Sequence, residues 1–147
     1  MNMTGTVLLV ENNADDARLA QLAFERAQVR FALMIVADGS EAMDYLKGRG
    51  RYSDRERFPF PKYIFLDLGM PGLSGFEMLE QLRGDPELQN VPITILSGSN
   101  HSPDVKRALE LGAKSFLEKP SDLRKFSEAI KEMVNDSQRS PHCSNDL

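Results

Sequence analysis

The sequence predicts an α/β fold in which helices cover both faces of a parallel β-sheet. Five short apolar runs recur along the 147 residues, and each is followed by a segment with helical spacing. Continuous apolar runs of this length are typical of strands that are buried on both faces of a sheet. An alternation of strands and helices requires right-handed crossovers, which place helices on both sides of that sheet.

The predicted strands are the apolar runs themselves. They span residues 6–10, 31–37, 63–66, 91–96 and 115–117. Five parallel strands suit a doubly wound (βα)5 sheet in the flavodoxin-like order 2-1-3-4-5. We expect residues 1–136 to form one domain and the polar residues 137–147 to form a flexible tail.

Capping residues indicate where four of the helices begin. Residue types preferred at the N-cap precede helical stretches at Asn13, Ser74, Ser102 and Ser121. Glu77 completes a capping box with Ser74, and Pro103 occupies the first position after Ser102. The remaining helix is predicted at residues 40–47. The inward faces expected for the last two helices comprise Val105, Ala108 and Leu109, and then Phe126, Ile130, Met133 and Val134.

Composition excludes several classes of protein. The net charge of −4 argues against a general nucleic-acid binder. Cys143 is the single cysteine, so an internal disulfide is impossible and a reducing compartment is expected. Because no apolar stretch approaches the ~20 residues of a membrane span and no signal peptide is evident, we predict a cytoplasmic protein without membrane contact.

Polar residues follow four of the predicted strands where each strand ends. These are Glu11 and Asn12, then Asp67, then Ser97 with Gly98, and finally Lys119 with Pro120. Ligands of open α/β sheets bind beyond the carboxyl ends of the strands, so we expect these side chains to share one site. Carboxylate and amide oxygens suit Mg²⁺, which commonly binds through one or two carboxylates and a phosphate.

This set of groups also suits phosphoryl transfer. Asp67 is the candidate nucleophile that forms an aspartyl phosphate. Lys119 and the Ser97 hydroxyl are candidates to bind two of the phosphoryl oxygens.

The same segments resemble the CheY-like receiver domain of two-component response regulators. The resemblance rests on Val10-Glu11-Asn12, on Asp67-Leu68-Gly69-Met70-Pro71 with Gly75, on Ser97-Gly98, and on Lys119-Pro120. It extends from about residue 6 to residue 134. The long connection over residues 48–61 also looks like that of small stand-alone regulators paired with bacteriophytochrome-type histidine kinases.

The resemblance implies a function for each of these positions. It makes Asp67 the phosphoacceptor and Glu11 with Asn12 the acidic pair. The Gly69 carbonyl would complete the metal ligands. It makes Lys119 the phosphate-binding lysine. Ser97 and Phe116 would be the switch residues, and Phe116, which has no hydroxyl, would act through packing alone.

Asn12 departs from the family pattern, in which a carboxylate normally stands at this position. An amide oxygen can coordinate Mg²⁺ but supplies no charge, so weaker metal binding is expected. Glu11 is one methylene longer than aspartate and could reach in to compensate. The alternative to a working switch is a pseudo-receiver, a binding module of the same fold whose phosphorylation has been lost.

The resemblance implies protein partners. A sensor histidine kinase of the phytochrome type would phosphorylate Asp67, and a downstream protein or phosphotransfer protein would read the result. A homodimer through the fourth helix, fifth strand and fifth helix is compatible with the family. The protein would be a switch, with at most slow self-phosphorylation and self-dephosphorylation.

Two enzyme or cofactor classes fit poorly. Aspartyl-phosphate hydrolases need a second aspartate two residues after the nucleophile, where this chain has Gly69. A flavodoxin-like FMN binder needs a hydroxyl-rich phosphate loop after the first strand, which is missing.

The connection over residues 47–62 carries six basic residues and two acidic ones. The basic residues are Lys47, Arg49, Arg51, Arg55, Arg57 and Lys62. A partner-docking patch and a solvated basic loop are both compatible with this pattern, and the solvated loop is the interpretation that composition favours.

Overall fold

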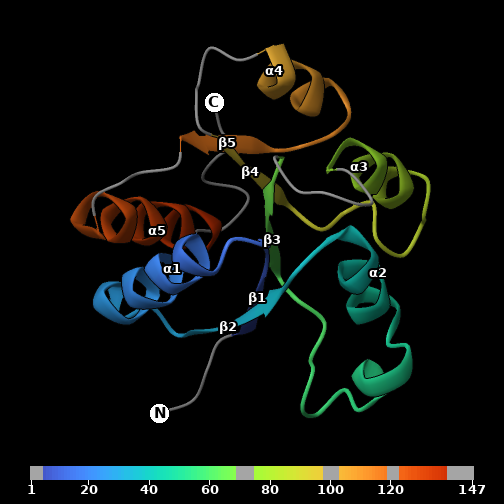
Figure 1. The fold of residues 1–147 in the computed structure, drawn as a ribbon, viewed down its shortest axis with the longest axis horizontal. Coiled ribbons are helices and arrows are strands. Elements are labelled where there is room, and N and C mark those ends of the chain that lie inside the picture. Colours follow the sequence, from blue (N-terminus) through green and yellow to red (C-terminus); the bar gives the residue numbers. More distant parts are fainter. Residues whose placement is uncertain (1–4, 69–74, 98–102, 119–122, 139–147) are drawn as a thin grey trace.

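A computed structural model of the chain describes residues 5–68, 75–97, 103–118 and 123–138 (Figure 1). The five strands are β1 Gly5–Val10, β2 Phe31–Val36, β3 Tyr63–Asp67, β4 Ile93–Ser97 and β5 Ser115–Glu118. The helices are α1 Ala14–Ala27, α2 Gly39–Lys47, the 3-10 helix η1 Gly50–Ser53, α3 Gly75–Arg83, α4 Pro103–Glu110 and α5 Leu123–Gln138.

All strand pairs are parallel, and the sheet has the order β2-β1-β3-β4-β5. The predicted α/β fold class and strand order are therefore confirmed. In Figure 1, α1 and α5 lie together on one side of the sheet, and α2 and α3 lie on the other.

Alternation of side chains along the strands builds two cores. Leu8, Val10, Ile64, Leu66 and Ile95 face α2 and α3 in one cluster. The intervening strand residues Val7, Leu9, Phe65 and Leu96 pack with α1 and α5 in the other. Because successive side chains of a strand point to opposite faces, each continuous apolar run supplies both clusters.

Of the four predicted caps, Asn13 lies within the described residues, and it caps α1 as predicted. The Asn13 side chain accepts a hydrogen bond of 2.9 Å from the Asp16 backbone N–H, which caps α1. Asp38 caps α2 in the same way, so α2 begins one residue earlier than predicted. Ser74, Ser102 and Ser121 lie outside the described residues, although α3 and α4 begin directly after Ser74 and Ser102.

Other predicted details are wrong as well. Leu109 is 38% exposed, whereas Val105 and Ala108 are buried. We attribute this to the position of α4 near the edge of the sheet, where a narrow helical stripe suffices to cover it. The strand predicted at residues 91–96 begins only at Ile93, because the Val91 N–H bonds back to the Leu88 carbonyl and Pro92 has no N–H.

The last residues of α5 overlap the first residues of the predicted tail. Phe126 and Ile130 are buried as expected, while the side chains of Met133 and Val134 are outside the described part. The helix continues to Gln138, and the tail predicted beyond residue 136 stays a prediction. Within the described ranges, no helix is both long and apolar enough to cross a membrane.

Candidate functional site

The register of β1 and β3 places two carboxylates side by side. Val10 pairs with Leu66, so the residues that follow, Glu11 and Asp67, stand at the same level of neighbouring strands. Glu11 is 3% exposed and Asp67 is 7% exposed. They are the only charged residues buried to this extent in the described part of the chain. Burying two acids together is costly unless a cation or hydrogen bonds compensate their charge.

Glu11 is held at the beginning of α1. Its backbone N–H donates to the Val36 carbonyl at 2.9 Å, which extends the β1–β2 ladder by one residue. Its carboxylate Oε2 accepts a hydrogen bond of 3.2 Å from the Asn13 backbone N–H. The positive end of the α1 dipole further favours a carboxylate at this place. Asn12 lies between these two anchored residues and is exposed.

Asp67 is the last residue of β3 and pairs with Leu96 in β4. The chain beyond it is packed tightly against the first residue of α3. A Cβ atom on Gly75 would lie 2.9 Å from Cδ2 of Leu68 and 3.7 Å from the Asp67 carbonyl oxygen. The glycine eight residues after Asp67 therefore allows α3 to approach the backbone next to the acid.

Two other predicted site residues are Ser97, at the end of β4, and Lys119, directly after the end of β5 in the sequence. Ser97 ends β4 and pairs with Glu118 of β5, so its backbone lies at the same edge as Asp67. Lys119 directly follows Glu118. Lys119 and Gly69 lie outside the described residues, as does the side chain of Ser97. Phe116 pairs with Ile95 in the edge strand and is 37% exposed.

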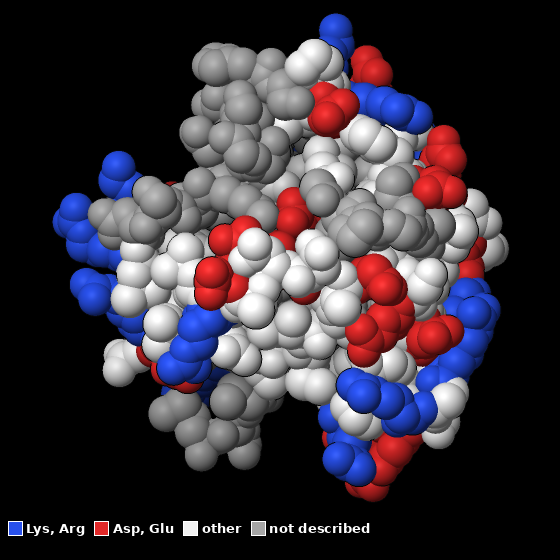
Figure 2. All heavy atoms as spheres, in the orientation of Figure 1, with Lys and Arg blue, Asp and Glu red and all other residues white. Residues whose placement is uncertain are grey.

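Charge is distributed unevenly over the molecule. Figure 2 shows acidic side chains near the middle of the viewed face and basic side chains mainly toward its rim. The described residues contain no cluster of three His, Cys, Asp or Glu side chains suited to a metal. Two adjacent buried carboxylates nevertheless supply the hard oxygen donors that Mg²⁺ prefers, with water, carbonyl and phosphate oxygens as its other usual ligands.

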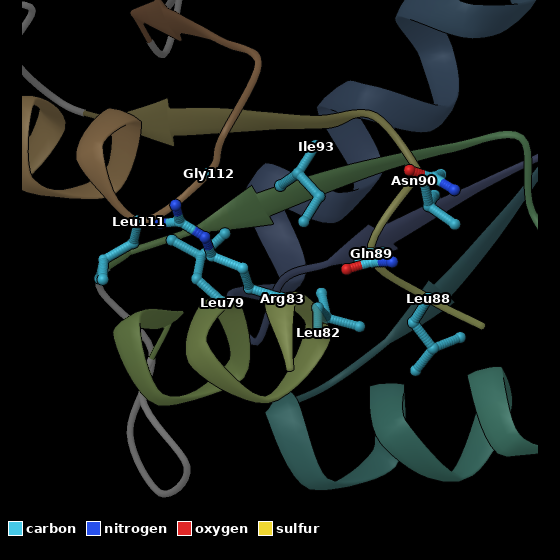
Figure 3. Close-up of a pocket in the computed structure, with 10 residues that line it drawn as sticks. Leu79, Leu82, Arg83, Leu88, Gln89, Asn90, Ile93, Leu111 and Gly112 are labelled. Carbon is cyan, nitrogen blue, oxygen red and sulfur yellow. The ribbon is translucent and has the colours of Figure 1, made fainter. Parts of the chain in front are cut away.

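A pocket of about 230 Å³ lies elsewhere, between α3, the start of β4 and the turn after α4 (Figure 3). Its lining includes Leu79, Leu82, Leu88 and Ile93, with Arg83 across one side. The guanidinium of Arg83 donates to the Glu110 carbonyl at 2.8 Å. The strands are parallel, Ile93 begins β4 and Asp67 ends β3. This pocket therefore lies near the amino ends of the strands, whereas the two carboxylates lie at the carboxyl ends.

A match to a known protein-family model identifies the family of this chain. Residues 7–131 match the model of the response regulator receiver domain. The chain belongs to the response regulator receiver family. It is a receiver-domain response regulator of two-component systems, and the predicted resemblance is confirmed.

Individual relatives narrow the subfamily. Response regulator Rcp1 of Synechocystis sp. is 33% identical over 123 residues, which are 84% of this chain and 82% of that protein. The crystal structure of response regulator RPA3017, in red light signalling of R. palustris, superposes with a TM-score of 0.84 at 32% identity. That match covers 89% of this chain and 92% of the other.

A third relative is the phosphorylated cyanobacterial phytochrome response regulator RcpA. Its crystal structure has a TM-score of 0.78 at 31% identity and covers 89% of this chain and 91% of that one. A Mn²⁺-bound form of Rcp1 has a TM-score of 0.76 at 29% identity, with 92% and 96% covered. RcpA is a phytochrome response regulator by its description, and two further structural neighbours are described as bacteriophytochrome response regulators. The long connection over residues 48–61 predicts similarity to this group.

Asn13 makes one contact near the site that the sequence did not predict. Asn13 was predicted as a helix cap, and its backbone N–H also binds the Glu11 carboxylate. The sequence clue is that Asn13 lies two residues after the acid, within reach of a turn at the start of α1. Glu11 is therefore fixed by the same turn that starts the helix.

Proposed function

We propose that this receiver-domain response regulator accepts a phosphoryl group on Asp67. The observation that carries the proposal is the burial of Asp67 beside Glu11 at the carboxyl edge of the sheet. The receiver-family match adds the chemistry expected at that edge. The pseudo-receiver alternative has no support from the relatives.

The proposed reaction is a phosphoryl transfer from a phosphohistidine of a sensor histidine kinase. A carboxylate oxygen of Asp67 attacks the phosphorus, the P–N bond breaks, and the imidazole departs and takes up a proton. Lys119 would neutralise one phosphoryl oxygen and the Ser97 hydroxyl would hydrogen-bond another. Ser97 ends β4 and Lys119 follows β5 in the sequence, and both strands end on the same side of the sheet as β3.

Mg²⁺ is the proposed cofactor. Glu11, Asp67, the Asn12 amide and the Gly69 carbonyl are the groups that would hold it, and hard oxygen donors of this kind fit the ion. When bound, the ion would offset the negative charge that builds up among the carboxylates and the phosphoryl oxygens. The existence of a Mn²⁺-bound form of Rcp1 supports a divalent cation as the cofactor.

The output would pass through protein contacts. Ser97 would reorient on phosphorylation, and Phe116 would shift its packing on the exposed edge strand β5. A surface of α4, β5 and α5 would then bind a downstream or phosphotransfer protein, or a second copy of the chain. The kinase is proposed to be of the phytochrome type, on the strength of RcpA and RPA3017. The protein would act as a switch rather than an enzyme, and its cytoplasmic location stays a prediction.

Intact mass spectrometry tests the proposal. Incubation with acetyl phosphate and Mg²⁺ is expected to add one phosphoryl group to the wild-type chain. The addition should be lost in Asp67→Asn and retained in the matched control Asp44→Asn, which removes an acid from α2. Absence of any gain across a wide range of Mg²⁺ would favour the pseudo-receiver instead.

A further inference from the structure

The connection between α2 and β3 has an ordered centre beneath an exposed surface. It includes η1, and its centre is the side chain of Arg55. The guanidinium donates hydrogen bonds to four backbone carbonyls, those of Tyr45, Leu46, Tyr52 and Phe58, at 2.8 to 3.2 Å. Two of these carbonyls belong to the last turn of α2, so Arg55 acts as a side-chain cap of that helix. The interpretation favoured from composition, a solvated basic loop, is therefore wrong for Arg55.

An aromatic cluster lies beneath the same segment. The rings of Tyr45, Tyr52 and Phe58 contact one another with centroid separations of 5.0 to 6.1 Å. The hydroxyl of Tyr45 donates to the Pro59 carbonyl at 2.9 Å, and the hydroxyl of Tyr52 donates to the Glu41 carboxylate. Tyr45 and Tyr52 are almost fully buried. The cluster therefore provides a rigid base for the residues outside it.

Three exposed arginines stand on this base, and we name Arg49, Arg51 and Arg57 the arginine ridge. The guanidinium carbon of Arg51 lies 4.7 Å from the centre of the Tyr52 ring. That of Arg57 lies 5.4 Å from the centre of the Phe58 ring. Stacking on an aromatic face restricts a guanidinium while leaving its edge N–H groups available to a partner.

The ridge keeps most of its charge uncompensated. Arg49 and Asp44 approach to 3.7 Å, as do Arg51 and Glu41, and these pairs lie at the surface, where ion pairs contribute little. The side chains of Arg49 and Arg51 are 62% and 71% exposed despite these pairs. Among the described residues, no carboxylate forms a salt bridge with Arg57. Basic side chains also gather at the lower right of Figure 2, below the place where Figure 1 labels α2.

The arginine ridge lies away from the proposed phosphorylation site at Asp67. α2 begins after the carboxyl end of β2 and runs back across the sheet, so η1 lies toward the amino end of β3. Asp67 lies at the other end of that strand. A partner bound at the ridge would therefore leave the carboxylates and the α4–β5–α5 face open.

We propose that the arginine ridge docks an acidic segment of a partner protein. Guanidinium groups pair with carboxylates through two parallel hydrogen bonds, and the stacked rings have already restricted Arg51 and Arg57 for this contact. A protein segment suits the ridge better than a nucleic acid, because the chain has a net charge of −4 and an acidic opposite edge. Docking is independent of Asp67, so it holds the partner before and after phosphorylation.

Fluorescence anisotropy with a defined probe tests this inference. The probe is a fluorescein-labelled peptide of about ten residues that alternates glutamate with glycine, measured against the full chain at about 50 mM salt, where screening is limited. The double variant Arg51→Ala/Arg57→Ala should weaken binding about tenfold or more, as expected for losing two charge-assisted contacts. The matched control Arg18→Ala/Arg26→Ala removes the same charge from α1 and should change binding less than about twofold.

Further variants and probes distinguish specific docking at the arginine ridge from a general attraction between opposite charges. Arg51→Lys/Arg57→Lys keeps the charge but loses the planar fork, and should recover only part of the affinity. The inference is overturned if the peptide fails to bind, or if the α1 control weakens binding as much. It is also overturned if a DNA duplex or a phosphatidylserine vesicle binds the ridge more tightly than the peptide. Acetyl phosphate labelling of these variants should be unchanged, which separates failure here from failure of the proposed phosphorylation.

Discussion

At the scale of single residues, the site depends on two acids that the fold buries next to each other. Asp67 was predicted from its position at the end of an apolar run before a glycine- and proline-rich segment. Glu11 was predicted from the same rule at the first strand. The sequence could not show that Glu11 is also bound by the Asn13 N–H, because that contact depends on the turn geometry at the start of α1. The functions assigned to the site residues all stay predictions, those of Asp67 and Glu11 included.

The substitution Asn12→Asp should raise the affinity for Mg²⁺ about tenfold or more. One added charge at about 4 Å and an effective dielectric of about 20 contributes about 4 kcal/mol before desolvation. A tenfold gain in affinity requires only part of this energy. Calorimetric titration of Mg²⁺ measures the change. Asn13→Asp is the matched control, since it adds the same charge one residue away and aspartate still caps a helix. Equal gains in both variants, or none in Asn12→Asp, would argue against a metal at this position.

The buried phenol of Tyr45 predicts a loss of stability at high pH. Burial raises its pKa from 10.0 to about 12, so the folded state keeps its proton where the unfolded state has released it. The stabilisation is complete below pH 10.0 and declines as the pH rises toward about 12. Urea unfolding across this range should show a shallower decline in Tyr45→Phe than in wild type. A decline of the same steepness in both proteins would contradict the assignment.

At the scale of the elements, prediction succeeded where a short pattern determines the structure. Apolar runs identified all five strands, and Asn13 identified the start of α1. Prediction failed where the outcome depends on packing between distant segments. Arg55 looks like one more basic residue of a polar loop, and its inward position depends on carbonyls from α2, η1 and Phe58 meeting at one point.

Arg55→Ala should lower the free energy of unfolding by about 2–4 kcal/mol. The variant leaves several partly buried carbonyls without a donor, and hydrogen bonds to a charged group contribute roughly 1.5–3 kcal/mol each without adding fully. Arg55→Lys should restore only part of the loss, because an ammonium cannot reach the same carbonyls as a planar fork. Urea unfolding followed by circular dichroism measures both. Arg49→Ala, at the exposed surface, should change stability by less than about 0.5 kcal/mol, and a loss as large as that of Arg55→Ala would refute the distinction.

At the scale of the whole molecule, the parallel sheet gathers residues that are far apart in the sequence. The strand order places β3 between β1 and β4, so the strands that end at residues 10, 67 and 97 have their carboxyl ends side by side. Order cannot be read from apolar patterning, because any arrangement of five buried strands has the same pattern. The order was predicted from the family of folds, and the family match explains why that prediction succeeded.

Binding of Mg²⁺ should stabilise the whole fold. A ligand that binds only the folded state adds about 2.7 kcal/mol when its concentration is about 100 times its dissociation constant. The melting temperature should therefore rise with Mg²⁺ in wild type and in the surface control Asp44→Asn. The rise should be much smaller in Asp67→Asn, and an undiminished rise there would place the ion somewhere other than beside Asp67.

The central claim is that Asp67 accepts the phosphoryl group, and peptide mapping after borohydride reduction tests it most directly. Reduction converts an aspartyl phosphate to homoserine, and trypsin releases residues 63–83 as one peptide in which Asp67 is the only aspartate. We predict homoserine at position 67 after treatment with acetyl phosphate and Mg²⁺, and unmodified aspartate without the donor. Homoserine at another position, or an unchanged peptide from a chain that has gained a phosphoryl group, would contradict the account.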